Sequence, residues 1–114
     1  WAMTRACWLV RKGSVLASAE RAVSRTERRR GLLGRSGMEG ALVLDHTRCV
    51  HTVGMKFAID VAHVDAAGTV LRISHLRPYR MGAYVRAASW MIEAEAGAFE
   101  RWGLRVGDQL ELRE

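Results

Sequence analysis

The residues with the most evident chemical potential are Cys49 and His51, in the densest polar stretch of the sequence. Two positions apart, their side chains would share one face of a β-strand. With a third group such as His46 or His63 they could ligate a metal, and alternatively they could form a nucleophile–base pair. The pair is too short a motif for a closed metal site, and Cys7 completes no zinc-binding spacing. We therefore predict no metal ligand and no catalytic residue, and we expect both cysteines to be free thiols.

Thr52 and Asp60 follow in the same polar stretch, and a structural role explains them more readily than a catalytic or metal-binding role. We expect His51 and Thr52 to form hydrogen bonds within the wall of a sheet and so to fix the fold. Asp60 stands between two branched aliphatic residues, and a buried carboxylate there requires a partner. On a helical wheel Arg30 lies apart from most neighbouring arginines, which makes it the candidate for a bidentate pair with Asp60. A solvent-facing Asp60 is the alternative.

The positive charge of the chain is concentrated in one segment. Residues 21–35 hold six arginines against Glu27, a net charge of +5 out of +6 for the whole chain. The planar fork of arginine suits carboxylate or phosphate ligands. The simpler interpretation is a solvated helix face whose arginines pair with nearby carboxylates. The arginines of this segment are Arg21, Arg25, Arg28, Arg29, Arg30 and Arg35.

A nucleic-acid interface is a third interpretation of the basic residues. Binding to single strands requires exposed aromatic rings as well as phosphate contacts. Tyr79 and Tyr84, in a basic loop with Arg77, are the only good candidates for such rings. The tryptophans in apolar patterns are expected in the core, and these are Trp8, Trp90 and Trp102. We therefore consider nucleic-acid binding a lesser alternative.

Length and composition define the class of domain that must position these residues. A chain of 114 residues with 49% hydrophobic and 26% charged residues fits one globular domain, residues 1–114, and excludes disorder. No apolar run is long enough for a transmembrane segment. The pattern predicts a mainly β (α+β) fold, a small β-barrel or sandwich of six to seven short strands with one main flanking helix and one short helical turn. The expected strands are 7–10, 15–19, 41–44, 59–64, 69–73, 89–95 and 109–112, with the main helix at 25–33 and the helical turn at 98–102.

Several motifs in sequence order resemble one family. Residues 27–35 resemble the Glu-Arg-x-Arg-Gly-Leu-x-x-Arg signature of domain-of-unknown-function family 192, which is widespread in bacteria and archaea. The similarity covers about residues 7–112, and the central motif at 51–61 has its His-Thr-x-Gly-Met form, with Ala58 where a proline is often found. The resemblance implies a compact β-rich domain with a flanking helix, and it implies no established activity. The further matching stretches are 64–70, 76–80, 93–97 and 103–108.

Together these observations favour a non-enzymatic module that binds a small ligand, an anion or a partner protein. The alternative is an enzyme that uses His51 with Asp60 or Cys49. No cofactor is implied, and the expected partner is an anionic small molecule or a protein. We expect a cytoplasmic location for the chain as given, or export if a signal peptide has been removed. The candidate ligand-binding residues are Arg28, Arg30, Arg35, His51, Thr52, Met55, Asp60 and Arg77.

Overall fold

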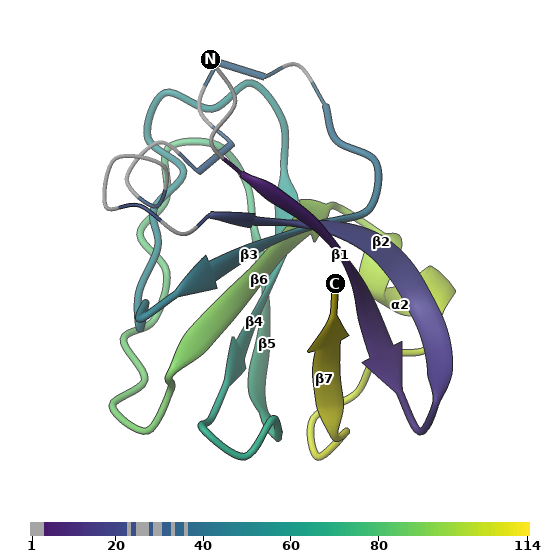
Figure 1. Ribbon diagram of the computed structural model, residues 1–114. Helices are drawn as coiled ribbons and strands as arrows, with labels where there is room; N and C mark the ends of the chain where they lie inside the picture. The colour runs from purple at the N-terminus through teal and green to yellow at the C-terminus, as the bar shows by residue number, and fades with distance from the viewer. Residues whose placement is uncertain (1–3, 23, 25–27, 29–30, 33, 36) are drawn as a thin grey trace.

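The computed structural model describes residues 4–22, 24, 28, 31–32, 34–35 and 37–114. These residues form a seven-stranded sheet in the order β5-β4-β6-β3-β2-β1-β7, with one short helix (Figure 1). Only β2 and β3 pair in parallel, and all other neighbouring strands are antiparallel. The predicted mainly β class is confirmed. The elements are β1 (Arg5–Arg11), β2 (Ser14–Ala22), β3 (Ala41–Asp45), β4 (Ile59–Val64), β5 (Val70–Leu76), β6 (Trp90–Glu95), α2 (Ala98–Trp102) and β7 (Leu110–Arg113).

Local turn chemistry sets the predicted hairpin between β4 and β5. In the β4–β5 turn the Asp65 carboxylate accepts hydrogen bonds from the backbone N–H groups of Ala67 and Thr69, at 3.0 and 2.8 Å. Gly68 then adopts a φ of 88°, a left-handed conformation that glycine tolerates best. The turn thereby fixes the register in which Asp60 lies opposite His75.

The two edge strands, β5 and β7, meet at one end only. Thr69 and Gln109 form an isolated bridge, and the Leu110 N–H donates to the Gly68 carbonyl at 2.8 Å. A Cβ at Gly68 would lie 2.3 Å from the carbonyl oxygen of Leu110, so this close approach requires glycine. Two further hydrogen bonds join Val70 to the turn before β7, from the Val70 N–H to the Asp108 carbonyl at 2.9 Å and from the Gly107 N–H to the Val70 carbonyl at 2.8 Å. Among the described residues no strand ladder joins β5 to β7, and the sheet is not closed into a barrel.

Alternating side chains bury a core on each face of the sheet. On β6, Ile92 packs into one cluster with Val43 and Phe99, whereas Met91 packs into the other. The second cluster contains Met55 and eight further buried residues: Ala22, Leu32, Met38, Leu42, Leu44, Ile59, Val61 and Met91. This alternation matches the period of two expected for strands between two covered faces.

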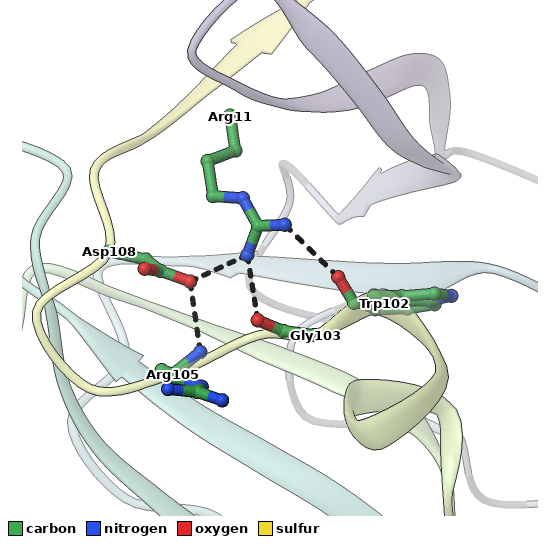
Figure 2. Close-up of polar contacts among 5 residues, drawn as sticks. All are labelled: Arg11, Trp102, Gly103, Arg105 and Asp108. Carbon is green, nitrogen blue, oxygen red and sulfur yellow. Dashed lines mark hydrogen bonds and ion pairs between the residues drawn. The ribbon is translucent and has the colours of Figure 1, made fainter.

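Helix α2 is held at both ends by charged side chains from distant strands. At its N-terminal end, the Asp60 carboxylate accepts the backbone N–H groups of Gly97 and Phe99, at 3.0 and 3.2 Å. At the other end, Arg11 Nη1 donates to the Gly103 carbonyl and to the Asp108 carboxylate, both at 2.8 Å (Figure 2). The short helix is thus fixed by tertiary contacts and not by its own length.

Trp8 was expected in the core but is 50% exposed, because Cys7 and Leu9 on either side of it take the inward positions of β1. The helix expected at 25–33 lies largely outside the described residues. Within them, the Arg28 N–H donates to the Ser24 carbonyl at 3.0 Å, the spacing of a helical hydrogen bond.

No helix among the described residues is both long enough and apolar enough to cross a membrane.

Candidate functional site

Two loops, residues 46–57 and 77–88, lie side by side and are joined by backbone hydrogen bonds. We call them the paired loops, and they run along the left of the molecule in Figure 1. The Gly82 N–H donates to the Val50 carbonyl at 2.9 Å, and the Val85 N–H donates to the Arg48 carbonyl at 3.1 Å. A Cβ at Gly82 would lie 2.8 Å from that Val50 oxygen, so glycine permits the close approach. The loops therefore present a defined surface instead of two independent segments.

Thr52 is the centre of this pairing. Its hydroxyl, fully buried, donates to the Arg77 carbonyl at 2.6 Å and accepts the Arg80 N–H at 2.8 Å. Its own backbone N–H donates to the Arg80 carbonyl at 2.8 Å, and its carbonyl accepts the Tyr79 N–H at 2.9 Å. All of these groups belong to the loop scaffold, so Thr52 is structural as expected, but it joins two loops and does not lie in the wall of the sheet.

His63 supports the paired loops from β4. Its Nε2 lies 3.0 Å from the Arg48 carbonyl and 2.9 Å from the Ala83 carbonyl, one acceptor from each loop. Because both neighbours are acceptors, Nε2 must carry a proton. Burial lowers the pKa of His63, which favours the neutral ring. His63 is therefore a structural link between the loops and offers no metal-binding nitrogen at Nε2.

Cys49 and His51 do not form a chemical pair. The Cys49 thiol lies 3.4 Å from the Gly82 carbonyl, and His51 Nδ1 accepts the Val53 N–H at 3.1 Å. No hydrogen bond joins the two side chains in the part of the chain that the structure describes. That part also contains no cluster of three His, Cys, Asp or Glu side chains that could hold a metal ion.

The outer surface of the paired loops is basic and partly apolar. Residues 46–58 and 77–92 contain no Asp or Glu, and among the described residues no carboxylate forms an ion pair with their cations. The cations are Arg48, Lys56, Arg77, Arg80 and Arg86. Four large hydrophobic side chains are also more than half exposed here: Val53 (52%), Tyr79 (64%), Met81 (72%) and Tyr84 (63%). We call these nine side chains the basic platform.

The structure divides the predicted site residues among several places. His51, Thr52, Met55 and Arg77 all belong to the paired loops, but the Met55 side chain is buried in the core cluster beneath them. Arg35 pairs with Glu20 of β2, with Nη1 and Oε2 3.1 Å apart.

Arg28 is half-buried, and Arg30 lies outside the described residues. The proposed Arg30–Asp60 pair stays a prediction. The imidazole that contacts Asp60 is His75 and not His51, with Nδ1 and Oδ1 3.1 Å apart. The single pocket that the sequence suggested therefore does not gather all of its residues.

Sequence reasoning missed two residues that matter electrostatically, His75 and Glu93. The register of the predicted 59–64/69–73 hairpin could have placed His75 opposite Asp60. Glu93 is 3% exposed, and its Oε1 has no hydrogen-bond partner among the described residues. Burial raises the pKa of Glu93 to about 7. The alternation along β6 could have revealed an inward-facing carboxyl between Met91 and Glu95.

The fold and site define a small domain built on one curled, open β-sheet, with a basic loop surface and a helix fixed at both ends. The chain belongs to the DUF192 family, described as an uncharacterized ACR, whose model matches residues 8–112. It is 34% identical over 62 residues to UPF0127 proteins of Pyrococcus furiosus and Pyrococcus abyssi, and the match covers 54% of this chain. The chain spans about half the length of these curated relatives, 53% in each case.

Two solved structures share the fold. A protein of unknown function from Novosphingobium aromaticivorans has a TM-score of 0.78 at 17% identity, with 95% of this chain and 84% of that chain covered. A putative transcription regulator from Sinorhizobium meliloti also has a TM-score of 0.78, at 22% identity, with 98% and 95% covered. At these identities the comparison establishes the fold alone.

Proposed function

We propose that the protein is a non-enzymatic binding module that holds an acidic segment of a partner protein on the basic platform. The observation that carries this proposal is the charge of the paired loops, whose five cations have no carboxylate partner among the described residues. A surface with one sign of charge attracts ligands of the opposite sign and raises their association rate.

The exposed hydrophobic residues favour a protein partner over a small inorganic anion. Tyr79, Tyr84 and Met81 are residue types enriched at protein interfaces, as is arginine. Val53 and Met81 are aliphatic and would add nothing to base stacking, so the mixture fits an acidic peptide with apolar residues better than a nucleic acid. The scaffold beneath is already hydrogen-bonded through Thr52 and His63, so binding would require little reorganisation of the backbone.

The test is fluorescence anisotropy with a labelled peptide that alternates glutamate and leucine. A peptide that alternates glutamine and leucine controls for apolar contacts, and single-stranded oligo-deoxythymidine represents nucleic acid. We expect saturable binding of the glutamate peptide, weakened by salt, and binding of the glutamine peptide at least about tenfold weaker. Equal binding of the two peptides, no binding of either, or tighter binding of the oligonucleotide would overturn the proposal.

Charge reversal locates the site. Arg80→Glu and Arg77→Glu should each weaken binding of the glutamate peptide by about tenfold or more. The matched control is Arg101→Glu, which makes the same charge change at an exposed position of α2. Similar losses in the control and the loop variants would show that only net charge matters, and the platform would not be the site.

A further inference from the structure

A concave surface separate from the basic platform lies beside α2, against residues 73–75 of β5. It is an open depression of about 690 Å³, a volume within the roughly 300–1,000 Å³ typical of small-molecule sites. None of the residues that line it belongs to the paired loops, so the inference does not rest on the proposed function. The lining includes Ile73, His75, Phe99, Glu100, Leu104 and Arg105.

The floor of the depression is apolar and belongs to the core. Phe99 and Leu104 are 3% and 6% exposed, and Ile73 packs against the same cluster. The backbone between Phe99 and Leu104 is fixed, because the Leu104 N–H donates to the Phe99 carbonyl at 2.9 Å. A ligand with a flat or compact apolar part would therefore meet a preformed surface.

Asp60, itself held by two backbone N–H groups, orients a histidine at the edge of this floor. Asp60 Oδ2 is occupied by the N–H groups of Gly97 and Phe99, while Oδ1 lies 3.1 Å from His75 Nδ1. The His75 side chain is 58% exposed, and a pair so exposed adds little stability. The main consequence of the Asp60–His75 contact is the orientation of the imidazole. Because Nδ1 is engaged by Asp60, Nε2 is the ring nitrogen left for a ligand.

Arg105 supplies a cation at the same depression. Its backbone N–H donates to Asp108 Oδ2 at 2.9 Å, and Figure 2 shows its guanidinium directed away from that carboxylate. The guanidinium forms no ion pair with any carboxylate of the described residues. The backbone of Arg105 is thus fixed while its planar fork, which suits a carboxylate, stays available.

We propose that this depression binds a small organic carboxylate with an apolar body. The apolar body covers Phe99 and Leu104, the carboxylate pairs with Arg105, and His75 Nε2 provides a second polar contact. Asp60 is a positioning residue, because it acts on the ligand only through the imidazole of His75.

The test is an NMR titration of the ¹⁵N-labelled protein with 3-phenylpropionate. The neutral control, 3-phenylpropanol, has the same apolar body without the carboxylate. We expect saturable shifts of the Gly97, Phe99 and Leu104 amide signals with the carboxylate, and at least about tenfold weaker binding of the alcohol. Absence of saturation, or equal binding of the two probes, would overturn the proposal.

Variants of the polar residues assign the contacts. Arg105→Gln should weaken 3-phenylpropionate binding by about tenfold, and His75→Gln should weaken it by a smaller factor. Glu100→Gln removes a negative charge from the same lining and should strengthen binding, whereas Arg86→Gln, at an exposed position of the paired loops, should leave it unchanged. An unchanged affinity in Arg105→Gln, or a weaker one in Glu100→Gln, would contradict recognition of an anion. Far-ultraviolet circular dichroism of each variant verifies folding.

Discussion

The ends of α2 and the paired loops are both rich in charge but use it in opposite ways. At α2, Asp60 and Arg11 are bonded to backbone groups at the N-terminal and C-terminal ends of the helix. These signs are the ones that the helix dipole favours at each end. On the paired loops, the backbone is satisfied by Thr52 and His63, and the cations are left without carboxylates among the described residues. On the paired loops Arg48 and Arg80 also donate to backbone carbonyls, of Ala88 and Tyr79, but no carboxylate of the described residues neutralises these cations. The charges at α2 therefore stabilise the fold, whereas the positive charge of the paired loops is available to a ligand.

The largest effect that would test this difference is expected at Asp60. Asp60→Ala leaves the N–H groups of Gly97 and Phe99 without their acceptor in a buried place. We expect the free energy of unfolding to fall by about 4 kcal/mol, measured by urea denaturation. His75→Ala removes only the half-exposed partner and should cost about 1 kcal/mol or less. Similar small losses in both variants would show that Asp60 does not hold the helix.

Glu93 is the buried counterpart of Asp60: both Asp60 oxygens have hydrogen-bond partners, whereas Glu93 Oε1 has none among the described residues. The pKa of Glu93 is raised from 4.5 to about 7 by burial, so the folded protein keeps a proton that the unfolded chain releases between these values. The contribution of Glu93 to stability is full below pH 4.5 and is lost as the pH rises through 7. In Glu93→Gln this dependence should disappear, a difference of about 3 kcal/mol across the range. Parallel stability–pH curves for the two proteins would refute the assignment.

Thr52 tests whether the loops share one scaffold. Thr52→Val keeps the shape of the side chain but removes a buried hydroxyl that donates to the Arg77 carbonyl and accepts the Arg80 N–H. We expect a loss of about 2 kcal/mol in the free energy of unfolding and faster hydrogen exchange of the Tyr79 amide. Thr47→Val, which removes one half-buried hydrogen bond to the Asp45 carbonyl, is the control and should cost about 1 kcal/mol or less. Unchanged exchange at Tyr79 would argue against a shared scaffold.

The smallest effect on stability is expected on the basic platform itself. Arg80→Glu changes an exposed side chain, so the free energy of unfolding should change by about 0.5 kcal/mol or less, while peptide affinity falls. Thermal denaturation and anisotropy on the same samples measure both quantities. A large loss of stability in this variant would place Arg80 with the structural charges and remove the contrast between the two regions.

Local patterns in the sequence predicted most of the elements and their faces. The Asp65–Gly68 turn and the alternation of Trp90, Ile92 and Ala94 were readable because turn chemistry and strand period act over a few residues. The continuous apolar run at 7–10 misplaced Trp8 in the core, because the alternation of the strand gives the inward positions of β1 to Cys7 and Leu9. Whether the expected sheet closed into a barrel was not decided by local pattern, because it depends on the distant contact between Thr69 and Gln109.

The sequence by itself determined the order of the strands along the chain, most of their inward faces, the uneven distribution of the arginines and the family. Only the tertiary structure decided that Asp60 holds α2 and contacts His75, that Glu93 is buried with Oε1 unpartnered among the described residues, and that the loops at 46–57 and 77–88 share one surface. The physical reason is the separation along the chain between the residues that interact. Turns and strand periods arise from interactions between near neighbours, whereas the partner of a charged side chain is chosen among residues that the folded sheet brings together from distant parts of the chain.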